Sequence, residues 1–447
     1  MPIKFLENLT ASLDAADLEA VSTMTEDEAR SFLYELRPVP DDMMPVSHQK
    51  KERTKDLSII IPAHNVEKFI SKCLSSVLIA LAPLDIDAEI LIAENDSTDN
   101  TRKIIENFGG IVRLLDCDGI TSVGAAKNRA LDEAEGRYLM FVDADDSVLE
   151  DSIGDMWRAL ITSGADIVAQ GFLDYDNDGA HPLTDIPREI ERYDQMSRVT
   201  TFLWGKIYKA ELFDELRCPE GLYYDNTIPL FLIYPRVKNM YLLDGCGYVY
   251  HRHKQAMTNV LQGSTKSIDT VWMLDYCLGQ MAEADRRRDP ITLYRNVMNH
   301  YSMLSWSRVR KMEDDVREAV FVVGACTLEQ IYETLTPEEI EQLPLLLTEM
   351  ELTLQTVFRN RHWRVWDYMC RHGREALKKR EEELLANQKK TAKKDAINEV
   401  KKDILQKKEA LKEAKKELKR EIAQHKEDIR QAKKNIALIR SSDIFIE

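Results

Sequence analysis

The sequence predicts an α/β protein with a mainly parallel central sheet, and three observations support this prediction. Short apolar runs follow one another along the chain as "LSIIIP", "AEILIAE", "GIVRLLD", "RYLMFVD" and "ADIVAQG". Amphipathic segments such as "NVEKFISKCLSSVLIAL" and "DNTRKIIENFG" lie between several of them. Polar residues follow the run ends, in "PAHN", "ENDSTD" and "DADD". Strands that alternate with helices form parallel sheets covered on both faces, and these sheets bind ligands at the carboxyl ends of their strands.

The N-terminal part of the chain divides into two predicted segments. Residues 1–54 are expected to form a helical cap followed by a Pro-rich, charged linker. Within this cap, Thr25 precedes Glu28 by three positions, which is the spacing of a helix capping box. Residues 55–260 contain the apolar runs and are expected to form the α/β domain.

The C-terminal part reads as helical. Residues 261–370 carry no strand signal, and we expect a helical domain whose core contains four of the six tryptophans: Trp272, Trp306, Trp363 and Trp366. Residues 371–447 are expected to form a long basic amphipathic helix. Its apolar face is formed by residues that recur at intervals of three, four or seven: Ile397, Val400, Ile404, Leu411, Leu418, Ile422, Ile429 and Ile436.

The composition is that of a soluble globular protein, with 44% hydrophobic and 31% charged residues among 447. The apolar runs are shorter than the roughly 20 residues that cross a bilayer, and the N-terminus lacks the features of a secretory signal. The seven cysteines are scattered and include no CxxC pair, so neither a zinc knuckle nor a disulfide framework is indicated. We expect a cytoplasmic protein with reduced, buried thiols.

The charge is distributed unevenly. Residues 371–440 carry a net charge of +10, within a total of −16, so the rest of the chain is strongly acidic. An acidic body argues against nucleic acid as a partner, and a basic tail indicates a partner of its own. Three interpretations of the tail remain open: homodimer formation, packing against the helical domain, and peripheral contact with the anionic inner face of a membrane. A strong coiled coil is not indicated, because the apolar positions form no continuous double seam.

Three carboxylates, Asp143, Asp145 and Asp146, lie at the end of the fourth apolar run. Asp143 and Asp145 flank Ala144, so on an extended strand end their side chains point the same way and could share a cation. Carboxylate oxygens suit Mg²⁺ or Mn²⁺. The alternative is that these residues cap the next helix, a role for which Asp146 and Ser147 are candidates.

Four motifs between Pro62 and Asp146 resemble those of the family 2 glycosyltransferases, which have the GT-A fold. The family's P-x-Y-N-like turn corresponds to "PAHN", and its D-D-x-S-T-D-like segment to "ENDSTD". The segment "GAAKNRA" is similar to the family's Gly-to-Asn motif, and "AEGRYLMFVDADD" to its A-x-G-x-Y-[IL]-x-F-x-D-x-D-D motif. The resemblance covers a little under half of the chain, and it implies a Rossmann-like GT-A domain that binds a nucleotide sugar.

The resemblance also implies a site for the donor. The turns after the first two strands would hold the base, and the metal strand would hold the diphosphate. Asn95 stands where many relatives have Asp, so its amide oxygen would face the N–H of uracil. The residues implied in nucleotide-sugar binding are Pro62, Ala63, Glu94, Asn95, Lys127, Asp143, Ala144 and Asp145.

A second group of motifs implies the catalytic base, the acceptor contacts and the rest of the metal site. Asp225 in "YYDN" matches the Asp that acts as base in relatives, whereas Tyr224 replaces the Glu that usually precedes it. Trp204 and Lys206 in "WGK" would face the acceptor, together with Tyr224, and the alternative for Trp204 is a packing role. In "YVYHRH", the resemblance implies that His253 joins Asp143 and Asp145 at a Mn²⁺ or Mg²⁺ ion. The neighbouring histidine, His251, stands where Arg is common.

The resemblance therefore implies a metal-dependent, inverting glycosyltransferase. The donor would be a nucleoside diphosphate sugar, most simply a UDP-sugar, and the acceptor a hydroxyl group of a growing glycan or lipid-linked glycan. The alternative is an assembly scaffold whose helical extensions bind partners and whose transferase site is degenerate.

Overall fold

The computed structural model describes residues 19–40, 51–117, 119, 122–176, 179–183, 188–253, 256–372, 412–413, 415–417, 419–421 and 423–435. Contacts within the chain define two units, Met1–Arg371 and His372–Glu447. Every residue of the predicted site lies in the first unit.

The first unit is built on a ten-stranded sheet in the order β3-β2-β1-β4-β9-β6-β10-β5, with β7 on β6 and β8 on β10. β3, β2, β1 and β4 run parallel, as does the pair β6 and β10. The short strands β5, β7, β8 and β9 are antiparallel to their neighbours, so the sheet is mixed where the sequence predicted a mainly parallel one. The strands are β1 (Lys55–Ala63), β2 (Ala88–Glu94), β3 (Arg113–Asp116), β4 (Gly136–Phe141), β5 (Ser147–Val148), β6 (Ile167–Asp176), β7 (Gly179–Leu183), β8 (Arg188–Ile190), β9 (Lys206–Lys209) and β10 (Met240–His251).

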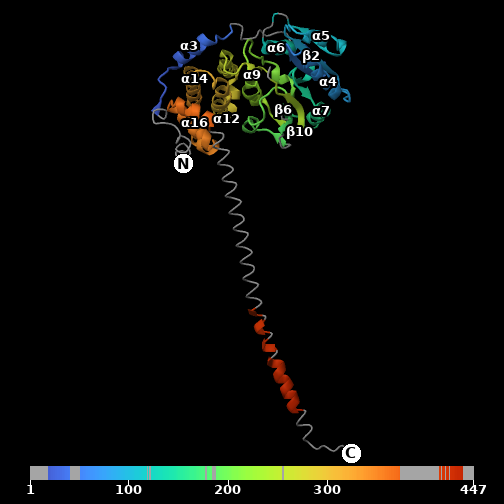
Figure 1. The fold of residues 1–447 in the computed structure, drawn as a ribbon, viewed down its shortest axis with the longest axis vertical. Coiled ribbons are helices and arrows are strands. Elements are labelled where there is room, and N and C mark those ends of the chain that lie inside the picture. Colours follow the sequence, from blue (N-terminus) through green and yellow to red (C-terminus); the bar gives the residue numbers. More distant parts are fainter. Residues whose placement is uncertain are drawn as a thin grey trace, which may run out of the picture. The chain divides into compact units, whose positions relative to one another are not determined.

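Helices α4 (Ile70–Leu81), α5 (Thr101–Glu106), α6 (Val123–Glu133) and α7 (Ser152–Ser163) connect the strands. α4 buries Cys73, Leu74 and Val77, which recur at helical spacing, in one core with Ile59 and Ile61 of β1. In Figure 1, α4 to α7 lie beside the labelled strands of the sheet. The chain runs outward from β1 through β2 to β3 and then returns to β4 on the other side of β1. This reversal brings the polar ends of β1, β2 and β4 together at one edge.

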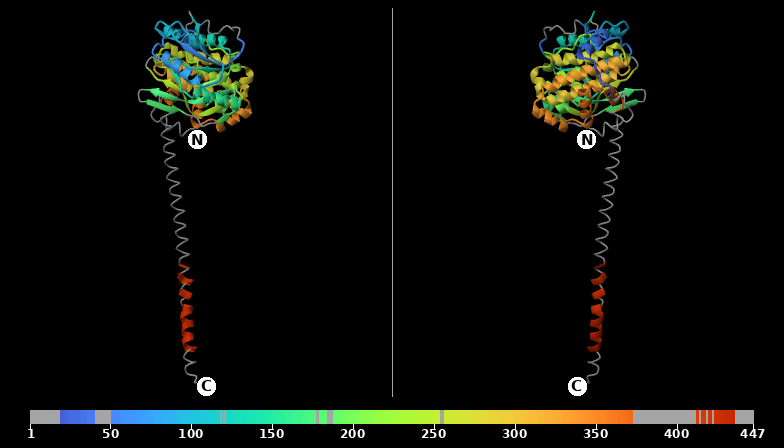
Figure 2. Two further views of the ribbon diagram at one scale, coloured as in Figure 1. Left: turned by 90° about the vertical axis from the view of Figure 1, so that its right-hand side faces the viewer. Right: turned by 90° about the vertical axis from the view of Figure 1, so that its left-hand side faces the viewer.

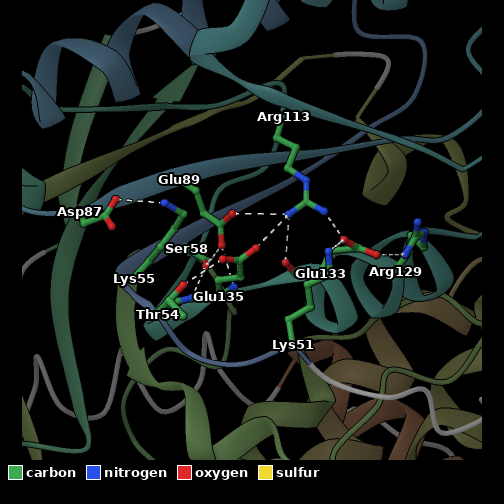
Figure 3. Close-up of polar contacts among 11 residues, drawn as sticks. Lys51, Thr54, Lys55, Ser58, Asp87, Glu89, Arg113, Arg129, Glu133 and Glu135 are labelled. Carbon is green, nitrogen blue, oxygen red and sulfur yellow. Dashed lines mark hydrogen bonds and ion pairs between the residues drawn. The ribbon is translucent and has the colours of Figure 1, made fainter.

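The opposite edge of the sheet is closed by a charged network (Figure 3). The carboxylate of Glu133, at the end of α6, forms ion pairs with Lys51, Arg113 and Arg129. Ion pairing with Lys51 and these arginines lowers the pKa of Glu133 to about 2. Next to it, Gly136 packs so closely on β1 that an added Cβ would lie 2.3 Å from the backbone nitrogen of Ser58. Charge pairs and close packing thus tie the amino ends of these strands together.

The helical region follows β10, and no strand occurs among the described residues after His251. All four of its tryptophans are buried, as predicted. Its long helices pack together in Figures 1 and 2, and α3 (Glu26–Leu36) crosses α14. The main helices are α10 (Asp269–Gln280), α11 (Glu283–Arg288), α12 (Pro290–Asn299), α13 (Trp306–Val309), α14 (Asp314–Glu333), α15 (Pro337–Leu346) and α16 (Glu349–Arg359), and residues 363–372 are also helical. Shorter helical turns are α8 (Tyr193–Met196), η1 (Gly109–Ile111), η2 (Ala210–Phe213), η3 (Pro229–Ile233), η4 (Tyr234–Arg236), α9 (Met257–Val260), η5 (Thr265–Ile268) and η6 (His300–Ser305).

Two predicted helical features can be compared directly with the structure. α3 begins with the predicted capping box, in which Glu28 N–H donates to the hydroxyl of Thr25 and Thr25 N–H donates to the carboxylate of Glu28. The terminal helix is present in the described part of 412–435, where the side chains are exposed and Ile429 is 56% exposed. The other residues of its predicted apolar face lie outside the described residues. No helix in the described part of the chain has the length and apolarity to cross a membrane.

Candidate active site

The turns that follow β1 and β2 bind each other through polar groups. Asn65, in a left-handed conformation with φ +51°, donates its N–H to the hydroxyl of Ser97 at 3.0 Å and accepts the N–H of Thr98 at 2.9 Å. Asn95 N–H donates to the carbonyl of Ala63 at 2.9 Å. The "PAHN" and "ENDSTD" segments thus form one rigid wall at the sheet edge.

The structure brings together the four residues predicted to hold the base. Pro62 and Ala63 pair with the end of β2. Glu94 is 1% exposed, and its carboxylate accepts the N–H of Ser97 at 2.8 Å and pairs with Arg102 at 3.3 Å, so it shapes the turn. Asn95 is 6% exposed and its Oδ1 is buried with no hydrogen-bond partner. A buried acceptor without a donor is unusual in a folded protein and suits a ligand N–H.

The "DADD" turn is anchored to β10 through its last carboxylate. Asp146, which is 2% exposed, accepts the hydroxyl of Tyr248 and the N–H of His251, both at 2.8 Å. Each of its two oxygens thus accepts one hydrogen bond from β10. Asp146 does not cap the next helix, because the N-cap of α7 is Asp151, and it anchors the turn instead.

Asp145 is the carboxylate that contacts a histidine. His253 Nε2 lies 2.8 Å from Asp145 Oδ2, and its ring packs at 4.6 Å from that of Phe69. His251 lies instead against Lys72, at 3.1 Å, and Ser147, and burial and the charge of Lys72 lower its pKa. His253 is thus the histidine beside the candidate metal carboxylate. Among the described residues, no three His, Cys, Asp or Glu side chains lie close enough to enclose a metal ion by themselves.

Negative charge accumulates around Asp143. Burial raises the pKa of Asp143 to about 7, and the carboxylates of Asp145 and Asp225 raise it as well, while Lys127 opposes them. Burial and the same neighbouring carboxylates also raise the pKa of Asp146. A site whose carboxylates resist ionisation in this way favours a cation, because a cation stabilises their charged forms.

The "GAAKN" segment of α6 holds the loop that carries Asp225. Lys127, which is 4% exposed, forms an ion pair with Asp225. Burial alone would lower the pKa of Lys127, but Asp225 and Asp143 raise it overall, so this lysine is charged. Asn128 accepts the N–H of Cys218 and donates to its carbonyl, each at 2.8 Å. Gly124 permits the approach, since an added Cβ would lie 2.4 Å from the carbonyl oxygen of Pro219.

Part of the chain is similar to a known protein family. Residues 58–214 match the model of glycosyl transferase family 2. This region of the chain belongs to that family. The chain is 26% identical to glycosyltransferase GlyA of Streptococcus pneumoniae, in an alignment that covers 46% of this chain and 32% of GlyA. It is 24% identical to glycosyltransferase GlyG of the same organism, in an alignment that covers 44% of this chain and 70% of GlyG. It is 38% identical over 91 residues, 20% of this chain and 35% of the relative, to a protein of Escherichia coli named UDP-Glc:alpha-D-GlcNAc-diphosphoundecaprenol beta-1,3-glucosyltransferase WfgD.

The fold of the transferase domain has a counterpart among solved structures. Staphylococcus aureus TarS 1-349 in complex with UDP-GlcNAc superposes with a TM-score of 0.56 at 19% identity, covering 71% of this chain and 92% of TarS 1-349. The fold class is therefore α/β GT-A with a helical C-terminal part. The chain spans between about a third and seven tenths of the first curated relatives it matches.

Trp204 and Lys206, for which acceptor contacts were predicted, are both buried in the structure. The ring of Trp204 is stacked between Phe202, at 4.4 Å, and Tyr248, at 4.3 Å, which is the packing role left open for it. Lys206 is 1% exposed, and its ammonium donates to the carbonyl of Phe202 at 2.7 Å. Both side chains pack in the interior beneath the site.

Tyr224, which stands where relatives usually have Glu, packs against an arginine. Its backbone is left-handed, with φ +71°, and the guanidinium of Arg308 lies 4.7 Å from the centre of its ring. A contact between Tyr224 and the acceptor stays a prediction.

Tyr248 is a functional residue of the transferase domain that the sequence analysis missed. Its hydroxyl donates to Asp146 and accepts the N–H of Asp143 at 3.0 Å, so it joins both ends of the "DADD" turn. The available signal was the alternation of aromatic residues in "YVYH", which places Tyr248 and Tyr250 on the same face of β10.

Proposed function

We propose that this chain transfers a sugar from a UDP-sugar to a hydroxyl group of a glycan acceptor, with inversion at the sugar carbon. One observation carries the proposal: the carboxylate of Asp225 forms an ion pair with the buried ammonium of Lys127, and the charges of Asp145 and Asp225 help to raise the pKa of Asp143 beside them. This cluster has more negative than positive charge, which suits a donor that arrives with a divalent cation.

The base pocket supports uridine as the nucleoside. The buried, unpartnered Oδ1 of Asn95 would accept the N–H of uracil, and the rigid wall of Pro62 and Ala63 would contact the ring. TarS structures with UDP-GlcNAc and with UDP, and the UDP-Glc named for WfgD, are consistent with this choice. The sugar would be a hexose or an N-acetylhexosamine.

Asp145, Asp143 and His253 are the residues proposed to hold the cation. Because no three such side chains among the described residues lie close enough to enclose an ion by themselves, phosphates of the donor would have to complete the site. The oxygen and imidazole donors of these residues fit Mn²⁺ or Mg²⁺, which commonly take further ligands from substrate phosphates and waters. The bound cation would stabilise the charge of the departing nucleoside diphosphate. Asp146 and Tyr248 would keep the turn in place.

Asp225 is proposed as the general base. Its carboxylate would take the proton of the acceptor hydroxyl as the hydroxyl oxygen attacks the sugar carbon and the bond from that carbon to the diphosphate breaks. Lys127 would orient Asp225 through their ion pair. Attack from the face opposite the leaving group inverts the carbon.

The names of the relatives support a glycan or lipid-linked glycan as acceptor. They include a glucosyltransferase that acts on a diphosphoundecaprenol glycan and a poly(ribitol-phosphate) beta-N-acetylglucosaminyltransferase. We propose that the reaction takes place in the cytoplasm. For the terminal helix, homodimer formation, packing against the helical domain and membrane contact stay open.

The test is a donor panel. Purified protein is incubated with individual nucleotide sugars, with Mn²⁺ or with chelator, and the released nucleotide is measured. We expect UDP release from one UDP-sugar that chelator abolishes and that Asp145→Asn greatly reduces. A folded protein that neither binds nor turns over any nucleotide would contradict the proposal and favour the scaffold alternative.

A further inference from the structure

The turn that leads into Asp225 has an unusual backbone. Gly221 has φ +74° and Tyr224 has φ +71°. The left-handed conformation costs a non-glycine residue such as Tyr224 about 1 kcal/mol or more, and it persists only where surrounding structure maintains it. On one side, α6 holds this loop through Asn128 and Lys127.

The other side is held by a residue from outside the matched family region. Arg37, just after α3, donates from Nη2 to the carbonyl of Gly221 at 2.8 Å. The same guanidinium binds both oxygens of Asp269 in α10, at 2.6 and 3.0 Å. Pro40 covers the turn so closely that a Cβ at position 221 would lie 2.6 Å from the proline Cγ.

Asp269 completes the connection to the turn. It is 0% exposed, and the oxygen that accepts Arg37 Nη2 also accepts the N–H of Tyr223 at 3.2 Å. The indole N–H of Trp272 donates to the carbonyl of Arg37 at 3.0 Å, which fixes the arginine backbone. One buried carboxylate and one guanidinium thus join the N-terminal segment, α10 and both ends of Gly221–Tyr223.

We propose that Arg37 and Asp269 are positioning residues for the transfer reaction: the N-terminal segment holds the turn that aims Asp225 at the acceptor. This inference rests on the proposed role of Asp225 as base. Removing the guanidinium would leave Asp269 buried without its countercharge, so the carboxylate and the turn would rearrange toward water. A displacement of about 1 Å at a reacting group can lower the rate by about 100-fold.

The α3 helix offers a matched control. Arg30 also binds α10 with a guanidinium, at 2.6 Å from Asp275, but it makes no contact with the turn. Arg37→Ala and Arg30→Ala each remove one ion pair between the N-terminal segment and α10. We expect Arg37→Ala to lower kcat by about 10- to 100-fold with little change in donor KM, and Arg30→Ala to leave kcat near the wild-type value.

A second measurement does not depend on turnover. Hydrogen exchange should accelerate at the Tyr223 amide in Arg37→Ala and stay slow in Arg30→Ala, because only the first change releases Asp269. Arg37→Lys keeps the positive charge but cannot make the paired hydrogen bonds of a guanidinium to Asp269. Its kcat should therefore lie between those of Arg37→Ala and the wild type. If Arg37→Ala does not fold, Arg37→Lys serves in the same comparison with Arg30→Lys.

The outcomes separate the two proposals. If the wild-type protein turns over no donor but Arg37→Ala still accelerates hydrogen exchange at the Tyr223 amide, the proposed function is contradicted. The structural connection between Arg37, Asp269 and the turn would then still be supported. Equal effects of the Arg37 and Arg30 variants on kcat and on exchange, or no effect of either, would overturn the positioning role.

Discussion

At the scale of single residues, the hydroxyl of Tyr248 joins two carboxylate residues of one turn. Tyr248→Phe removes the donor to Asp146 and the acceptor of the Asp143 N–H, both in a buried setting. We expect a loss of about 1–3 kcal/mol in the free energy of unfolding and weaker metal-dependent turnover. Denaturant unfolding and the nucleotide-release assay measure the two effects. Tyr175→Phe, on the neighbouring strand β6, is the control and should change neither, whereas equal effects of both variants would argue against the bridging role.

The role of Asp225 makes a second prediction. Asp225→Asn keeps a side chain of the same shape but cannot take a proton, so donor binding should persist while transfer falls by about 10²- to 10⁴-fold. Calorimetric titration with UDP-sugar and the turnover assay distinguish the two. An exposed carboxylate on β10, Asp244, supplies the control Asp244→Asn. Loss of donor binding in Asp225→Asn would mean that Asp225 belongs to the donor site.

The free energy of unfolding should depend on pH through the titration of His300. Burial lowers the pKa of His300 to about 4, and its Nε2–H donates to the carbonyl of Thr270 at 2.9 Å. Between pH 6.5 and 4 the unfolded chain binds a proton on this histidine, whereas the folded chain does not. The free energy of unfolding therefore falls as the pH falls, by about 3 kcal/mol over this range. Gln can replace the donor without titrating. The Tm of His300→Gln should depend less on pH than that of the wild type over this range, and parallel curves would contradict the prediction.

Side-chain roles were predictable where they follow from a rule about strand ends. Polar residues after β1, β2 and β4 had to meet at one edge because these strands are parallel. The positions of Trp204 and Lys206 were not predictable in this way. Trp204 is buried because the rings of Phe202 and Tyr248 stack on it, and the buried ammonium of Lys206 donates to the carbonyl of Phe202. A single sequence does not report such contacts.

At the scale of elements, α6 and the Asp225 loop touch through a glycine. Gly124→Ala would place a methyl group 2.4 Å from the Pro219 carbonyl, so the loop or the helix must shift. We expect a destabilisation of about 1–3 kcal/mol and a lower kcat. Gly279→Ala in α10 is the matched control, because an added Cβ there meets nothing within 4 Å, and it should be neutral or stabilising by up to about 1 kcal/mol. Similar melting temperatures for both variants would contradict the close approach.

The elements that the sequence predicted are those with a local signal. β1, β2, β3, β4 and β6 contain apolar runs, and the capping box of α3 involves residues three positions apart. The antiparallel strands β5, β7, β8 and β9 have two to five residues each, too few for a period to be visible. Their pairing depends on strands that are distant in sequence, as in the pairing of β5 with β10.

At the scale of the whole molecule, every residue of the candidate site lies in the unit Met1–Arg371. A chain that ends after Arg374 should therefore keep its turnover of a soluble acceptor. Sedimentation of the full and shortened chains, with and without anionic vesicles, tests the tail: loss of a dimer indicates self-association, and loss of vesicle binding indicates membrane contact. Loss of turnover in a shortened chain that still folds would contradict the prediction.

The contact between α3 and α10 also determines when the protein can finish folding. Arg37 and Arg30 precede their partners in α10 by 232 and 245 residues. At a synthesis rate of about 5–20 residues per second, the N-terminal helix leaves the ribosome about 10 to 50 seconds before its docking surface exists. During that interval Ala29 and Leu33, which the finished protein buries completely, have no α14 to pack against. A nascent chain that already contains Asp225 still lacks the contacts of Arg37 and Asp269 with its turn, so full activity should appear only after the helical region has been made.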